Sequence, residues 1–348
     1  MGFKRFDPED FVVSADTVTS TVWSGFQPSL NTYATSSVQK EGTSGPYYLS
    51  VYQTASNANG SETQFCIAFG DETGRGSVDF DSGVPGVSPS KTIYGQYRTL
   101  VLEDENSNFV YGSSFTGSHF YAVSVERARY KEKLFPGSMN LVISSSNTQL
   151  SALHLTDDSN MVNLPTYYGT QRAYQVISGS DGIAYNSGSG GLGYTTSEGS
   201  YGLFLPDIGT ILLNGKALDG VGADGGIELL TGRNQDTQDN NPAKLFIAMK
   251  GAGTDGNGFL LNSEETLSSD FIFVRARNSE FNYSENPSYI SGSTGAVIFD
   301  SFIDDPTTYI TSVGLYNDNN ELLAVAKLSR PLPKDFTKEL LVRVKLDF

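Results

Sequence analysis

Short apolar runs alternate with turn-forming residues along the chain. In the first hundred residues, the runs at 47–52, 64–69 and 97–102 are each bounded by Gly, Ser, Asn or Asp. Runs of this length, rich in β-branched and aromatic side chains, are typical of β-strands. The segment up to about residue 45 is more mixed and fits either strand or an extended arm. The pattern predicts a β-rich fold.

Residues 119–133 alternate with a period of two, which is the period of a strand. One face begins with apolar side chains and continues with four positive charges, and Pro136-Gly137 then interrupts the pattern. We therefore predict one strand whose first half is buried, followed by a returning strand at 139–143. The members of the face are Tyr121, Val123, Val125, Arg127, Arg129, Lys131 and Lys133.

The second half of the chain also predicts strands and turns. Asn214-Gly215 suits a tight hairpin turn. Residues 262–270 begin with Asn, Ser and two Glu, which favours one or two capped helical turns. The predicted strands of this region are 201–205, 210–213, 244–249 and 271–276, with a turn at Pro206-Asp207.

The last forty residues have the clearest pattern. Residues 309–316 and 322–328 flank Asn and Asp residues at 317–320, which predicts a hairpin that ends at Pro331-Leu332-Pro333. The final residues alternate between apolar and polar side chains. Since an apolar strand is stable only when it is covered, we expect burial by its own domain or by a neighbouring subunit. The apolar face is Leu340, Val342, Val344, Leu346 and Phe348.

The fold class predicted from these patterns is mainly β, with few short helices and long Gly/Ser/Asn loops. The chain has 348 residues, 38% of them hydrophobic, and 37 are glycine, which fits packed strands joined by turns. We expect two β-rich, sandwich-like parts. The first is 1–150, with an extended N-terminal arm, and the second is 151–348, with a Gly/Ser-rich insertion at about 178–202.

The negative charge of the chain limits the classes of partner that we expect it to bind. The formal net charge is −16, so the surface on average repels phosphate, and we expect neither nucleic acid nor anionic membrane as a partner. Cys66 is the single cysteine, so no intrachain disulfide can form. The sequence has neither a signal-peptide pattern nor a long apolar span. We expect a chain that is made soluble in the cytoplasm.

The sequence motifs that could indicate a catalytic, cofactor-binding or metal-binding site are weak. The two histidines, His119 and His154, have no partner at metal-ligand spacing, and Cys66 lies in an apolar run. We predict no catalytic, cofactor-binding or metal-ligating residues, no cofactor and no enzyme activity. We interpret two glycine patterns, 188, 190, 193 and 251, 253, 256, as chance matches to a dinucleotide-binding motif. We interpret the adjacent carboxylates at 157–158, 264–265 and 304–305 as solvated turns. Residues 236–240 resemble a calcium loop but lack its central glycine and closing glutamate.

The basic residues Arg127, Arg129, Lys131 and Lys133 have two interpretations. Lysines on a half-exposed strand discourage aberrant strand pairing. Alternatively, concentrated positive charge in so acidic a chain forms a docking surface for an acidic patch on another subunit. The sequence leaves both open.

Several segments resemble one family. They are YGQYRTL (94–100), RARYKEK (127–133), FNYSENP (281–287), YITSVGLYND (309–318) and VRVKLDF (342–348). Together they resemble virion structural proteins of contractile-tailed, T4-like marine phages, cyanophages in particular. The resemblance is spread over most of the chain and is strongest in the last seventy residues.

This resemblance implies a structural subunit of the virion without catalytic residues. Its partners would be other virion proteins and copies of itself in a symmetric assembly. A tail baseplate or wedge-like position is favoured, with head, vertex or neck as the alternative. The interface residues would include the four basic residues and the C-terminal apolar face.

A second class of function also fits a Gly/Asn/Ser-rich β protein with many tyrosines. This is a carbohydrate-binding or carbohydrate-cleaving tail protein. An aromatic-lined cleft with two converging carboxylates would distinguish it. A bacterial adhesin is the third class, and the missing signal pattern disfavours it.

Overall fold

The computed structural model describes residues 4–35, 48–74, 90–144, 152–185, 198–220, 226–227, 229, 241–254, 258–284 and 286–347. The protein is mainly β, with 45% strand and 17% helix, as the sequence predicts. It divides into two compact units. The large unit is Val18–Glu265, and the small unit combines Met1–Thr17 with Thr266–Phe348.

This division differs from the predicted boundary near residue 150. β10 (Leu141–Ile143) and β11 (Leu153–Asp157) pair as antiparallel neighbours, with Leu141 opposite Leu155. Because strands on both sides of residue 150 share one sheet, no boundary falls there. Instead, the chain passes from one unit to the other inside β1 (Phe11–Thr21) and again inside β18 (Asn262–Ala276).

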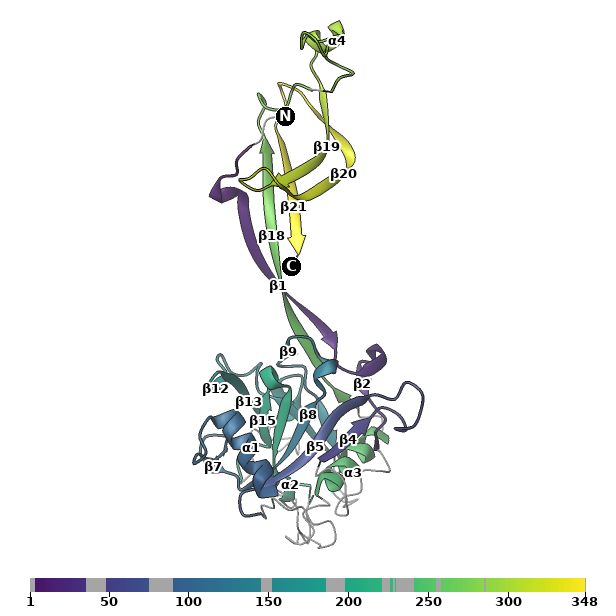
Figure 1. Ribbon diagram of the computed structural model, residues 1–348. Helices are drawn as coiled ribbons and strands as arrows, with labels where there is room; N and C mark the ends of the chain where they lie inside the picture. Colours follow the sequence, from purple (N-terminus) through teal and green to yellow (C-terminus); the bar gives the residue numbers. More distant parts are fainter. Residues whose placement is uncertain are drawn as a thin grey trace. The chain divides into compact units, whose positions relative to one another are not determined.

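The large unit is built on a curled antiparallel sheet of eleven strands (Figure 1). Its main path runs β10-β11-β13-β15-β16-β8-β5-β4-β3, and β12 and β14 pair with β13. The strands not yet given are β3 (Ala34–Thr35), β4 (Tyr48–Tyr52), β5 (Thr63–Asp71), β8 (His119–Val125), β12 (Thr166–Tyr168), β13 (Gln171–Ser180), β14 (Ile183–Ala184), β15 (Gly202–Leu205) and β16 (Thr210–Asn214).

Short elements complete the large unit. β2 pairs with β17, β6 pairs with β7, and β9 pairs with the start of β18. They are β2 (Ser29–Leu30), β6 (Val110–Tyr111), β7 (Phe115–Thr116), β9 (Lys133–Leu134), β17 (Phe259–Leu260), α1 (Ser90–Leu102), α2 (Gly215–Asp219), α3 (Asn241–Thr254), and the 3₁₀ turns η2 (Ser24–Phe26), η3 (Arg127–Arg129) and η4 (Pro206–Ile208).

A hydrophobic core lies on each face of this sheet. Successive side chains of a strand point to opposite faces, so Phe65 of β5 belongs to the larger core and Ala68 borders the smaller one. Leu245 of α3 packs into the larger core, and Val101 of α1 packs into the smaller. The large unit therefore buries apolar side chains on both sides of its sheet.

The small unit contains a three-stranded sheet in the order β1-β18-β21 and a separate hairpin (Figure 1). β21 (Leu340–Asp347) is antiparallel to β18, with Val344 opposite Ile272. Both side chains join Leu315 in a small buried cluster. The remaining elements are η1 (Pro8–Asp10), α4 (Asp300–Asp304), β19 (Thr308–Tyr316) and β20 (Leu322–Lys334).

The predicted strands at 97–102 and 244–249 are wrong, because both segments lie in helices. The first belongs to α1, where Ile93, Tyr94 and Val101 are buried at helical spacing. A short apolar run does not by itself distinguish a strand from part of a buried helix.

The helical turns predicted at 262–270 are also wrong. This segment is the first part of β18, which pairs with β9 at Ser263 and with β21 from Ser269 onward. Backbone pairing with two distant strands outweighs the weak capping signal of the local sequence.

The C-terminal hairpin is confirmed as β19 and β20, but its predicted end is not. β20 continues through Pro331 and Pro333 to Lys334, with a register shift between Ile310 and Ser312. Proline is tolerated because one edge of β20 has no strand neighbour among the described residues. The strands predicted around Pro206 are also confirmed, whereas Gly215 begins α2 rather than a hairpin turn.

Candidate functional site

The four basic residues do not share one strand face, so that prediction is wrong. β8 ends at Val125, and the chain turns through η3 before Lys133 enters β9. The turn is held by backbone hydrogen bonds, in which Glu126 N–H donates to the carbonyl of Gln64 and Arg129 N–H donates to that of Glu126. The period-two pattern continued in the sequence after the strand had ended.

Two of the four positive charges are neutralised within the chain. Arg129 donates to Glu62 at 2.7 Å, and Lys133 lies 3.4 Å from Glu264. The exposed Arg127 donates to the carbonyl of Tyr130 at 2.7 Å and lies over its ring. Lys131 is exposed and has no ion pair within the described part of the chain. Arg127 and Lys131 are therefore the exposed members that have no carboxylate partner among the described residues.

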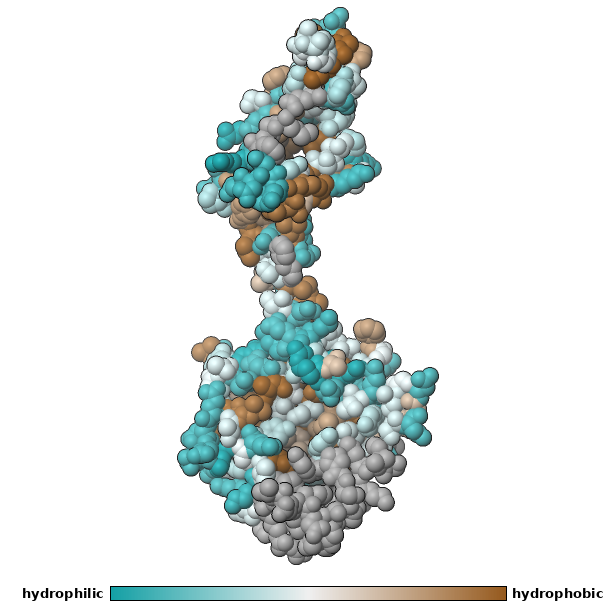
Figure 2. Space-filling model, viewed as in Figure 1, coloured by the Kyte–Doolittle hydropathy of each residue, from teal (hydrophilic) through white to brown (hydrophobic). Residues whose placement is uncertain are grey.

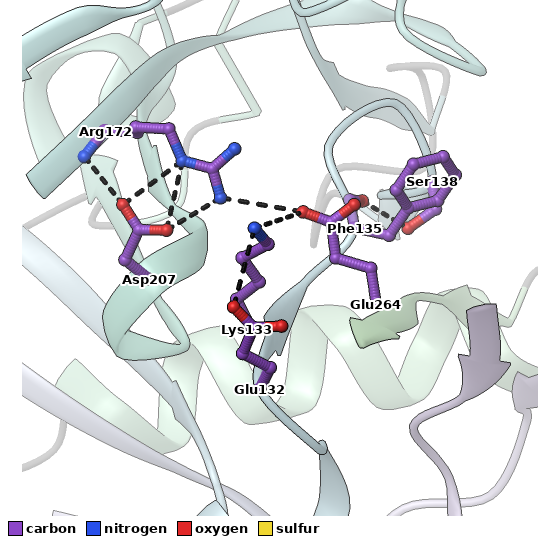
Figure 3. A network of polar contacts seen from close by, with 7 residues as sticks. All are labelled: Glu132, Lys133, Phe135, Ser138, Arg172, Asp207 and Glu264. Carbon is purple, nitrogen blue, oxygen red and sulfur yellow. Dashed lines mark hydrogen bonds and ion pairs between the residues drawn. The ribbon is translucent and has the colours of Figure 1, made fainter. Parts of the chain in front are cut away.

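A cluster of four charged residues lies where β18 begins (Figure 3). Arg172 of β13 binds Asp207 of η4, with a shortest distance of 2.7 Å, and lies 3.6 Å from Glu264 of β18. Lys133 of β9 contacts the same Glu264 carboxylate. We call these four residues the charged cluster. Its members come from four elements that are distant in the sequence.

The electrostatics of the charged cluster are those of paired ions. Partial burial raises the pKa of Asp207, but the hydrogen bonds and charge of Arg172 outweigh it and hold the pKa below its ordinary value. Hydrogen bonding to Asp207 raises the pKa of Arg172. Glu264 is only 8% exposed, and its carboxylate lies within ion-pair distance of both Lys133 and Arg172. Each member of the charged cluster therefore contacts at least one member of opposite charge.

The charged cluster fixes the start of β18. Glu264 pairs in register with Lys133, and Phe135 N–H donates to the carbonyl of Asn262 at 2.8 Å. Ser138 Oγ accepts from Asn262 N–H and donates to the carbonyl of Phe135. Together with the charged cluster, these hydrogen bonds hold the first residues of β18 in the large unit.

The small unit exposes an unusual amount of apolar surface. It holds about a third of the described residues but more than half of the exposed large hydrophobic side chains among them. Its buried hydrophobic residues in the same set are only Ile272, Ala276, Leu315 and Val344. Figure 2 shows apolar residues on the surface of this unit among polar ones. The exposed ones are Phe11, Val12, Val13, Phe281, Tyr283, Tyr289, Ile298, Phe299, Ile303, Tyr309, Tyr316, Leu322, Leu323, Val325, Phe336 and Leu341.

The C-terminal strand alternates as predicted. Val344 is buried, whereas Leu340, Val342 and Leu346 are half-buried, and Val342 and Leu346 pack against the same small cluster. Phe348 lies outside the described residues. The strand is thus covered by its own unit, and its part in a subunit interface remains a prediction.

The remaining candidates that the structure describes lie in several separate elements. The Nδ1 atom of His119 lies 3.4 Å from Ser118 Oγ, and its Nε2 atom lies 3.4 Å from a carboxylate oxygen of Asp219. The glycines at 251 and 253 lie inside α3, and those at 188, 190, 193 and 256 and residues 236–240 lie outside the described residues. Asp157 accepts hydrogen bonds from the N–H groups of Gly137 and Ser159, and its burial raises its pKa.

A cavity of ≈ 230 Å³ lies beside β13. Among the described residues, its lining includes one carboxylate, that of Asp158, and no aromatic side chain. Gln175 in the same lining accepts hydrogen bonds from Gly112 N–H and from Ser200 Oγ. This cavity lacks the aromatic platform and paired carboxylates of the carbohydrate hypothesis.

Two kinds of feature are absent from the described residues. These residues contain no group of three His, Cys, Asp or Glu residues placed to hold a metal ion. Within the same ranges, no helix has the length and apolar character needed to cross a membrane. Comparison with family models, curated proteins and solved structures finds no match to the chain.

Sequence reasoning missed the charged cluster. Lys133 was singled out, but its partner Glu264 was treated as a helical residue, and Arg172 and Asp207 carried no local signal. Their proximity depends on the order of strands in the sheet, which no short motif encodes.

Proposed function

We propose that the protein is a non-catalytic structural subunit of a tailed-bacteriophage particle, most specifically a tail or baseplate component that acts through contacts with other subunits. The observation that carries this proposal is the apolar exposure of the small unit, with only four buried hydrophobic residues in its described part, Ile272, Ala276, Leu315 and Val344. Large exposed apolar surfaces are uncommon on monomers and mark interaction sites.

The residue patterns support the same class of protein. The segments that resemble T4-like virion proteins include nearly all of β19, most of β21 and the residues around η3. The partners would be other virion structural proteins and copies of this chain. A head, vertex or neck position is the alternative within the particle.

The test is to fractionate particles of a phage that encodes this chain. Purified virions are separated into heads and tails, and the chain is quantified in each by mass spectrometry. We expect several copies per particle, in the tail fraction. A signal confined to heads would select the alternative position, and absence from purified virions would refute the proposal.

A matched variant tests the role of the small unit. Tagged full-length chain and a tagged fragment comprising residues 18–265 are supplied during infection in a host where the phage copy is disrupted. We expect only the full-length chain to be incorporated. Equal incorporation of the fragment would show that the exposed apolar surface of the small unit is not needed.

A further inference from the structure

β1 forms an unprotected edge of the small unit's sheet. It is the first strand in the order β1-β18-β21, so one of its edges has no strand neighbour in the described structure. Within its 11 residues, Asp16 is the single charged residue, and there is no proline or glycine. Phe11 and Val12 are each 47% exposed, and Val13 is 71% exposed. Edge strands that must stay unpaired are commonly protected by Lys or Pro, and β1 contains neither.

β21 forms the opposite edge of the same sheet and has the opposite charge character. Its exposed side chains include Leu341, Arg343 and Lys345. Arg343 lies over the ring of Phe271 and has no ion pair in the described ranges. Lys345 pairs only with Asp347, two residues further along β21. This edge therefore presents two positive charges beside the apolar Leu341, and that of Arg343 has no carboxylate partner among the described residues.

We propose that β1 of one copy adds to β21 of a second copy, with Asp16 of the first copy meeting Arg343 and Lys345 of the second. The proposal rests on the function proposed above, and it identifies a second copy of the chain as the partner of the exposed apolar residues of β1. A second copy is the fitting occupant because each chain carries both halves of the contact, one acidic and one basic edge of a single sheet. Backbone hydrogen bonds between the edges supply affinity, and the charges select the pairing.

Such a contact joins different surfaces of the two copies. Head-to-tail contacts of this kind produce rings when the rotation between copies closes. The proposal therefore predicts an assembly larger than a two-fold dimer formed from two identical edges.

The experiment measures association of the full-length chain by sedimentation velocity over a range of concentrations. We expect oligomers in the unmodified protein. Asp16→Lys alone, or Arg343→Glu with Lys345→Glu, should weaken association by at least roughly tenfold, because like charges then face each other. Asp304→Lys is the control, since Asp304 is exposed on α4 and should leave association unchanged.

Mixing the two edge variants gives the decisive result. In the mixture, the β1 edge that carries Asp16→Lys meets the acidic β21 edge of the other variant, so opposite charges face each other again. We expect the mixture to recover the association that neither variant shows alone. Circular dichroism of each variant checks that its strands are retained.

Three outcomes would overturn the inference. They are a monomer at all concentrations, unchanged association of the edge variants, and failure of the mixture to recover association while both variants are folded. A chain found in virions but monomeric in solution would refute this contact and leave the proposed function standing. A chain that forms the oligomer but is absent from virions would refute the proposed function instead.

Discussion

Lys334 illustrates how far a single residue can depart from the expectation for its type. Lysine is among the residues least often buried, yet Lys334 is 0% exposed. Its Nζ donates to the carbonyls of Asn278 and Asp335 and to Oδ1 of Asn282, at 2.9, 2.8 and 2.6 Å respectively. These acceptors satisfy all three donors of the ammonium group, which ties the end of β20 to the loop after β18.

Asp207 provides a pH-dependent test of the charged cluster. A folded-state pKa below the ordinary value of about 3.9 means that ionised Asp207 stabilises the protein above that pH, and that this contribution is lost as the pH falls towards the folded-state pKa. Asp207→Asn should therefore lower the free energy of unfolding at pH 7 by about 1–2 kcal/mol and have a progressively smaller effect below about pH 4.

The measurement is urea unfolding of both proteins at pH 7 and at pH 3. Asp304→Asn is the matched control, because Asp304 is exposed and should have no effect at either pH. An equal loss for Asp207→Asn at both values would mean that its contribution is not electrostatic.

Strands in this protein are easiest to recognise where one face is buried and the other exposed. β21 keeps this alternation along its length because the small hydrophobic cluster lies on one side only. The apolar runs within α1 and α3 predict strands because each run is only six residues long, whereas the period of a helix becomes visible over eleven residues or more. The length of the buried segment, rather than its composition, separates the two cases.

Val344 tests how much the small unit depends on its one-sided cluster. Val344→Ala removes a side chain that is 5% exposed, and the loss should be roughly 1.5 kcal/mol at about 0.8 kcal/mol per methylene equivalent. Val325→Ala on the hairpin is the control, because Val325 is 61% exposed and its truncation should cost less than about 0.5 kcal/mol.

Both free energies are measured by urea unfolding at protein concentrations where the chain is monomeric. Equal losses for the two variants would show that Val344 is not a core residue. A larger loss for Val325 would place the principal core of the small unit on the other face of the hairpin.

At the scale of the whole chain, the large unit is an insertion within the sequence of the small one. The small unit takes its strands from both ends of the chain, while the larger cores of the large unit are formed by residues between 18 and 265. The two ends of that range are joined within the large unit, since Val22 N–H donates to the carbonyl of Leu261 at 3.2 Å and the hydroxyls of Ser20 and Ser263 lie 2.8 Å apart.

We therefore expect the fragment Val18–Glu265 to fold by itself. It should be soluble, unfold in one cooperative transition, and remain monomeric at concentrations where the full-length chain associates. Circular dichroism during thermal unfolding and sedimentation velocity are the measurements. An unfolded fragment would mean that the large unit needs the small one, and an oligomeric fragment would place a self-association surface outside the small unit.

The sequence alone determined the class of the fold and the best-patterned elements. Mainly β structure, the hairpin of β19 and β20, the strands beside Pro206, and the alternation of β21 all follow from local periodicity and turn residues, because these depend on neighbours within a few positions.

Tertiary structure decided what depends on strand order. The predicted boundary lies near residue 150, but Leu141 pairs with Leu155 across it. Arg172, Asp207 and Glu264 converge only because β13, η4 and β18 meet in space. Hydrogen bonds between strands that are distant in the sequence fix where these side chains lie. Local patterns of neighbouring residues carry no information about which distant strands pair. The same pairing decides that β1 and β21 become the two edges of one sheet.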